Sequence, residues 1–131
     1  NSNGKPVYPL LAEKTEGIDG DWTLAEAKID LSPIDVSSDH ELVLKCYDYD
    51  QKFIDENDMD GLHLQVVVNG KYLLEMIGYQ DYEWRFSLGQ VKKAGEEVNQ
   101  VQINCNTFCP AKEGKNDARN LGIALKEIYV Q

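Results

Sequence analysis

Apolar and polar residues alternate along Leu62–Met76 on both sides of an Asn-Gly pair. Side chains two residues apart point to the same face of a β-strand, so one face before the pair is predicted to carry Leu62, Leu64, Val66 and Val68. Asn69-Gly70 supplies the positive φ that a two-residue hairpin loop needs at both central positions. We therefore expect a hairpin with the opposed pairs Val68–Lys71, Val67–Tyr72 and Val66–Leu73.

Glu75 does not fit this hairpin, because the register places it on the apolar face opposite Leu64. Either it has a partner there, or a β-bulge after Leu73 shifts the register. The other face of the second strand is apolar as well, with Tyr72, Leu74 and Met76. This pattern predicts a hairpin deep in a sheet, with the other strands added around it.

Further segments have the period or the length of strands and are bounded by turn residues. They are Trp22–Leu31, His40–Asp50, Tyr82–Leu88, Val98–Asn106 and Leu121–Val130, with one short strand at Val7–Leu11. Turns are expected at Gly17–Asp21 and Gly78–Asp81, and one helical turn within Gly89–Glu97. No long helix is indicated, although a short one remains open for Trp22–Leu31. The pattern predicts an all-β fold, an antiparallel β-sandwich (jelly roll) of about seven or eight strands. We assign residues 1–16 to a linker and 17–131 to this domain.

The chain has 131 residues and a formal charge of −10, from 23 acidic and 13 basic residues. This charge argues against nucleic acid or an anionic membrane as partner, because both require a basic surface. No apolar run is long enough for insertion into a membrane, and the opening NSNGKPVYPLL is typical of a linker in a longer protein. A neutral or cationic ligand, a bound cation or solubility alone would explain the charge.

Three cysteines, Cys46, Cys105 and Cys109, cannot all pair within the chain. The C-x3-C spacing with two histidines elsewhere is a poor zinc pattern. Cys46 and Cys105 lie in alternating strands, where a free cysteine behaves as a small core residue. We expect reduced thiols, and one disulfide with one free thiol is the alternative.

Several short motifs occur in an order that resembles a known group of domains. They are Val68–Lys71 (VNGK), Phe86–Leu88 (FSL), Phe108–Pro110 (FCP), Asp117–Ala124 (DARNLGIA) and the opening Asp21–Thr23 (DWT). This series covers about two-thirds of the chain and resembles the jelly-roll, carbohydrate-binding-module-like domains appended to bacterial glycosyltransferases. The resemblance implies a jelly roll without catalytic activity, beside a neighbouring domain of a glycan-active parent protein. The compartment stays open: cytoplasmic and membrane-peripheral beside a glycosyltransferase, extracellular in a glycan-degrading or adhesive protein.

An acidic segment at 50–61 is the candidate metal site. The spacing Glu56-x-Asp58-x-Asp60-Gly61 imitates the first half of an EF-hand loop, but Val67 stands where the bidentate glutamate belongs. A looser structural Ca²⁺ site is one hypothesis, with the candidate ligands Asp55, Asp58 and Asp60. A solvated acidic loop is the alternative.

Motifs of nucleophilic or phosphate chemistry are missing from the sequence, so we expect no enzyme. Asp117-x-Arg119 is most simply a structural pair that fixes the last loop. The rows opposite the apolar rows instead offer aromatic rings, amides and charged groups that suit sugar hydroxyls. The candidate carbohydrate-binding residues are Tyr47, Tyr49, His63, Gln65, Glu83, Arg85, Gln102 and Asn104. An ordinary solvated face is the alternative for these residues. For the whole chain the alternative is a structural accessory domain that packs on a neighbouring domain or self-associates.

Overall fold

The computed structural model describes residues 8–9, 12–35, 41–49, 64–80 and 82–131. The strands are β1 (Tyr8–Pro9), β2 (Ala12–Asp19), β3 (Trp22–Ile34), β4 (Glu41–Tyr49), β5 (Leu64–Val68), β6 (Tyr72–Leu73), β7 (Met76–Gln80), β8 (Glu83–Ser87), β9 (Val98–Cys105) and β10 (Ile123–Val130). Two short helical segments are α1 (Gly89–Lys93), where one helical turn is predicted, and the 3-10 turn η2 (Pro110–Glu113). No helix in these ranges is long and apolar enough to cross a membrane.

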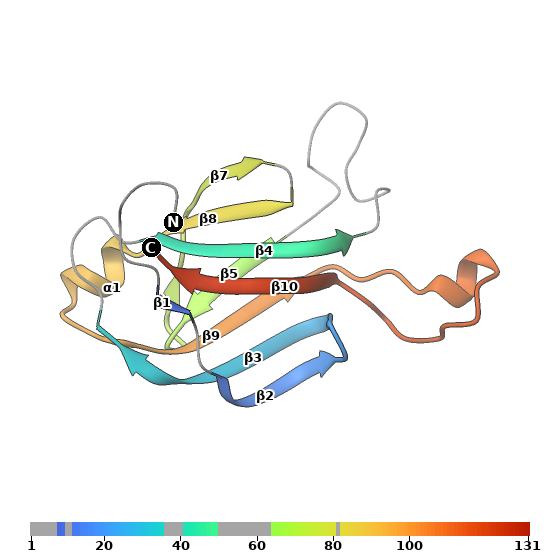
Figure 1. The fold of residues 1–131 in the computed structure, drawn as a ribbon, viewed down its shortest axis with the longest axis horizontal. Coiled ribbons are helices and arrows are strands. Elements are labelled where there is room, and N and C mark those ends of the chain that lie inside the picture. Colours follow the sequence, from blue (N-terminus) through green and yellow to red (C-terminus); the bar gives the residue numbers. More distant parts are fainter. Residues whose placement is uncertain (1–7, 10–11, 36–40, 50–63, 81) are drawn as a thin grey trace.

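The prediction of an antiparallel all-β fold is confirmed, in the form of one curled sheet that makes a half-barrel (Figure 1). In the described ranges the sheet has ten strands, more than the seven or eight predicted. Their order is β6-β5-β9-β3-β10-β4-β8-β7, with β1 paired to β10 and β2 paired to β3. The extra strands are short or lie at edges, where the alternation that marks a strand in sequence is weakest.

Strand β2 begins inside the segment that the sequence analysis assigned to a linker. Residues 12–16, placed in the lead-in, belong to this strand and pair with β3, for example Thr15 with Ile29. The segment is mostly charged and exposed. An edge strand protects its free side with charges, so its composition is that of a linker.

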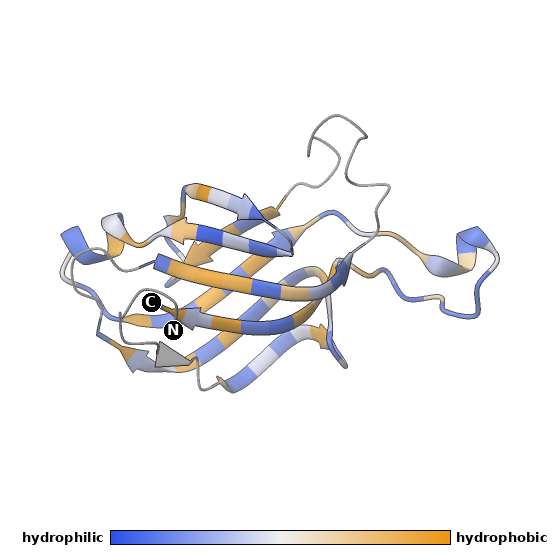
Figure 2. Ribbon diagram, turned by 45° about the horizontal axis from the view of Figure 1, so that its top comes forward, coloured by the Kyte–Doolittle hydropathy of each residue, from blue (hydrophilic) through white to orange (hydrophobic). Residues whose placement is uncertain are grey.

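The curled sheet has two halves that face each other across one core. The first half is β2-β3-β9-β5-β6 and the second half is β10-β4-β8-β7. The core cluster joins Val66 and Ile103 of the first half to Leu44 and Trp84 of the second. Figure 2 shows apolar positions interleaved with polar ones along strands of both halves, as one buried and one exposed face require. The polar rows of the two halves therefore point away from each other.

Thr23 holds the seam between the two halves, where β3 and β10 meet through the pair Trp22–Ala124. The carbonyl oxygen of Thr23 accepts from the Gly122 amide at 2.7 Å, and its Oγ1 accepts from the Ile123 amide at 3.0 Å. Thr23 is completely buried, and Oγ1 also lies 3.5 Å from Cys105 Sγ. These bonds explain how a polar side chain is accommodated inside the core.

The predicted hairpin is present, but its register and its place in the sheet are wrong. Asn69 and Gly70 have φ of 57° and 72°, as expected for their turn. However, Val68 pairs with Tyr72 and Val67 with Leu73, so Lys71 also belongs to the loop. The one-residue shift leaves Glu75 exposed, and β6 forms one edge of the sheet rather than its centre.

The chain after β6 runs from one edge of the sheet to the other. The amide of Leu74 donates to Val66 in β5 at 2.8 Å, while the carbonyl of Glu75 accepts from Ser87, the last residue of β8, at 3.0 Å. β7 then pairs with β8 and forms the opposite edge. Residues 74–75 thus tie the two edges together, and Gly78–Gln80, predicted as a turn, are part of β7.

Candidate functional site

The predicted carbohydrate-binding residues do not form one site. Gln65, Gln102 and Asn104 lie in the first half, on β5 and β9, whereas Glu83 and Arg85 lie on β8 in the second half. The strands β3 and β10 separate the two groups, whose side chains point outward from opposite sides of the core. The predicted group is therefore divided between two outer faces, and His63 lies outside the described residues.

The prediction that Tyr49 shares the outer face with Tyr47 is wrong. Tyr47 is 61% exposed, whereas Tyr49 is 6% exposed and belongs to the core cluster. The reason is a β-bulge at Tyr47: Cys46 pairs with Leu125 and Asp48 with Ala124. An extra residue in a strand reverses the direction of every side chain after it.

Tyr49 instead belongs to an aromatic cluster at the end of β4. Its ring lies 5.8 Å from Trp84 and 5.1 Å from Tyr82, and its hydroxyl is 2.7 Å from that of Tyr79. Trp84 is completely buried, and no partner for its Nε1 is found in the described part of the chain. These contacts give Tyr49 a structural role.

The amide group of the first half forms a short row on adjacent strands. Gln65 lies opposite Asn104, and Gln102 Nε2 donates to Asn104 Oδ1 at 2.9 Å. The neighbouring β3 adds an exposed ion pair between Lys28 and Glu26 at 3.3 Å. The side chains of this row pair with one another, as on an ordinary solvated face.

The charged group of the second half forms a ladder across β4 and β8. Arg85 Nε donates to Glu83 Oε2 at 2.9 Å, and its Nη1 donates to Glu41 Oε2 at 3.2 Å. Lys45 Nζ lies 3.6 Å from the other oxygen of Glu83 and 5.4 Å from the centroid of the Tyr129 ring. The hydrogen bond to Glu83 raises the pKa of Arg85 further above its usual value, so the guanidinium stays charged. A guanidinium has five N–H donors, and the two bonds to Glu83 and Glu41 use two of them.

A hollow of about 170 Å³ opens beside this ladder, over the paired strands β7 and β8. Its lining residues are Gly78, Tyr79, Gln80, Glu83 and Arg85. A register shift separates the pairs Met76–Phe86 and Gly78–Arg85, and a Cβ on Gly78 would have no atom within 4 Å. The absence of a side chain there leaves this space open. Sequence reasoning missed Gly78, Tyr79 and Gln80 because their glycine suggested a turn.

Metal and thiol chemistry find no support in the described ranges. The predicted Ca²⁺ ligands Asp55, Asp58 and Asp60 lie outside them, and within them no group of three His, Cys, Asp or Glu side chains is placed to hold an ion. All three cysteines are free. Burial raises the pKa of Cys46 to about 12 and also raises that of Cys105, so neither is a thiolate near neutral pH.

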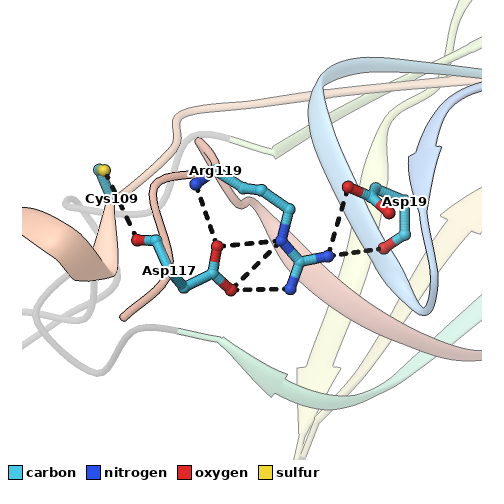
Figure 3. A network of polar contacts seen from close by, with 4 residues as sticks. All are labelled: Asp19, Cys109, Asp117 and Arg119. Carbon is cyan, nitrogen blue, oxygen red and sulfur yellow. Dashed lines mark hydrogen bonds and ion pairs between the residues drawn. The ribbon is translucent and has the colours of Figure 1, made fainter. Parts of the chain in front are cut away.

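A second polar cluster surrounds Arg119, in the long segment before β10 (Figure 3). Its Nη2 lies 2.7 Å from Asp117 Oδ2, and its Nε donates to Asp117 Oδ1 at 3.0 Å. On the other side, Nη1 lies 3.4 Å from both the carbonyl and the Oδ2 of Asp19 in β2. The predicted structural pair Asp117–Arg119 is confirmed. Its link to the β2–β3 hairpin could not be inferred, because Asp19 is 100 residues away in sequence.

Exposed large apolar side chains are concentrated on one stretch of the chain. Of the five that are found in the described ranges, Leu73, Met76, Ile77 and Tyr82 come from residues 73–82, and Tyr47 is the fifth. The sequence pattern placed Tyr72, Leu74 and Met76 in one apolar row, and the register shift is what exposes Leu73. We call residues 73–77 the apolar corner.

Comparison with models of known families, with curated proteins and with solved structures gives no match. The function is therefore argued below from the residues and their geometry.

Proposed function

We propose that this chain is a non-catalytic carbohydrate-binding module of a larger glycan-active protein. The proposed ligand site is the outer face of the second half, around the hollow over the paired strands β7 and β8. We further propose that the curled sheet belongs to the jelly-roll sandwiches, since its two halves enclose one core. The observation that carries the proposal is that two predicted residues, Glu83 and Arg85, line a hollow next to the charged ladder.

The chemistry of the lining supports a hydroxylated ligand. A sugar hydroxyl both donates and accepts hydrogen bonds, so adjacent hydroxyls can pair with a carboxylate and a guanidinium together. Gln80 adds an amide, which can both donate to and accept from a hydroxyl. Glu83 and Arg85 already orient each other, so little side-chain freedom is lost on binding.

The test starts with a glycan array probed with the isolated chain, and continues by calorimetry with the best hit. Arg85→Gln should weaken binding by about 10-fold or more, since hydrogen bonds to charged groups contribute about 1.5–3 kcal/mol. Gln102→Ala is the matched control, because it alters a polar residue on the outer face of the first half. A larger loss with Gln102→Ala would move the site to β5 and β9, and the absence of any array hit would reject the proposal.

The apolar corner supports a second candidate, a structural accessory domain that packs on a neighbouring domain or on a second copy. Exposed apolar side chains grouped along a surface commonly mark protein contacts, and Leu73, Met76 and Ile77 are all exposed. Under this proposal Ile77→Lys would abolish self-association in sedimentation experiments, or binding to the neighbouring domain of the parent protein. Tyr47→Lys is the control, because Tyr47 is exposed but distant in sequence from the corner. Equal behaviour of both variants and the wild type would reject this role.

A further inference from the structure

We propose that the hollow beside Arg119 is a second ligand site, which binds a small uncharged polyhydroxylated ligand such as a pyranose. This hollow measures about 350 Å³ and lies between the tip of the β2–β3 hairpin and the segment before β10. It is lined by Asp19, Leu24, Ala25, Ala118, Arg119 and Asn120. Its volume lies within the range of small-molecule pockets, which begins at roughly 300 Å³.

Arg119 is held firmly on one edge and loosely on the other. The Nε and Nη2 edge forms a bidentate pair with Asp117, and Asp117 Oδ1 also accepts from the Arg119 amide at 3.0 Å. The distances of 3.4 Å from Nη1 to Asp19 are long for a charge-assisted bond, which is typically about 2.7–2.9 Å. Asp117 therefore orients the guanidinium of Arg119. The Nη1 atom of Arg119 can exchange Asp19 for an oxygen of a ligand.

The remaining lining suits a carbohydrate ring. Leu24, Ala25 and Ala118 offer an apolar surface for C–H groups, and the small alanines keep the space open. Asp19 can accept from one hydroxyl, Arg119 Nη1 can donate to its neighbour, and Asn120 offers both kinds of group. One vicinal diol could therefore bridge Asp19 and Arg119.

The local charge selects against acidic ligands. Asp19 and Asp117 carry two negative charges around the single positive charge of Arg119, and the chain as a whole carries −10. A carboxylated sugar would have to approach Asp19 to reach Nη1, at a distance where like charges repel. An uncharged ligand avoids this repulsion.

This site is independent of the hollow at β7 and β8, because the two share no lining residue. We would follow the ¹⁵N–¹H signals of the Arg119 Nε–H group and the Ala25 and Ala118 amides while titrating methyl glucoside, methyl galactoside, methyl mannoside or glucuronate. We expect saturable shifts with at least one methyl glycoside, in the wild type and in Arg85→Gln. Ala118→Leu, which adds bulk to the lining of the hollow and leaves Arg119 itself unchanged, should abolish them.

The outcomes separate this inference from the proposed function. No saturable shift at these signals with any methyl glycoside overturns the second site, and shifts confined to Glu83 and Arg85 do so while leaving the proposed function intact. Shifts that persist unchanged in Ala118→Leu place the ligand elsewhere and also overturn it. Binding of glucuronate as tight as that of methyl glucoside would reject the ligand class.

Discussion

The ring of Tyr47 and the ammonium group of Lys126 lie together on the surface, with 5.7 Å between Nζ and the ring centroid. Each of them is the extra residue of a β-bulge in the β4–β10 pairing. Cys46 pairs with Leu125, Asp48 with Ala124 and Lys45 with Glu127, so the register passes over Tyr47 in one strand and Lys126 in the other. The contact has the geometry of a cation–π interaction. It joins the two residues that the β4–β10 pairing skips.

Tyr47 and Tyr49 should therefore respond differently to truncation. Tyr47→Ala removes an exposed ring and one cation–π contact, for a loss of about 0.5–1 kcal/mol in unfolding free energy. Tyr49→Ala removes a core ring and should cost about 3–5 kcal/mol. Urea denaturation of both variants measures the difference. Equal losses would contradict the bulge, because without it both rings would lie on the outer face.

Asn69 should stabilise the hairpin through its side chain as well as its backbone. Its Oδ1 accepts from the amides of Asn99 and Gln100 at 2.9 and 3.3 Å, and its Nδ2 donates to the Glu97 carbonyl at 2.8 Å. Asn69→Gly keeps the positive φ accessible but removes these bonds, so we expect a loss of about 1 kcal/mol or more by urea denaturation. A neutral result would mean that only the conformation of the turn matters.

Gly122 should tolerate no side chain. A Cβ there would lie 2.3 Å from Cys105 Sγ and 2.5 Å from Thr23 Oγ1, at the seam between the halves. Gly122→Ala should destabilise by about 1–3 kcal/mol through overpacking. Gly78→Ala is the matched control, because its Cβ meets no atom within 4 Å and should leave the melting temperature nearly unchanged. Similar melting temperatures for the two variants would contradict the close packing at Thr23.

The Asp117–Arg119 pair should make a pH-dependent contribution to stability. The hydrogen bonds that Arg119 donates lower the pKa of the Asp117 carboxyl from 3.8 to about 2 in the folded chain. A carboxyl whose pKa is lowered by folding stabilises the folded state at pH values above its pKa in the unfolded chain. This contribution disappears as the pH falls from about 4 to about 2.

Asp117→Asn has no such titration and tests this directly. The difference in unfolding free energy between wild type and Asp117→Asn should be constant above pH 5 and should shrink toward pH 2. Urea titrations at several pH values and at low salt measure it, because salt screens an exposed pair. A difference that does not change with pH would show that the pair does not stabilise the fold through charge.

Local patterns in the sequence were sufficient for much of the fold. The alternation of Ala27, Ile29 and Leu31 predicted a strand, and Asn69-Gly70 predicted a turn with positive φ. Asp117 and Arg119 are two residues apart, so their pairing also follows from nearby positions. In each case the deciding interactions lie within a few residues of one another.

The candidate site depended on contacts that no local pattern contains. Strand side chains alternate with a period of two, so a single bulge turned Tyr49 inward, and a single shift after Val68 exposed Leu73. The partner strand decides where such a shift occurs. By itself the sequence determined where most of the strands lie and the alternation within them, as in β3 and β9. Only the tertiary structure decided which rows share a face, because strands distant in sequence become neighbours when the sheet curls and its edges meet at residues 74–75.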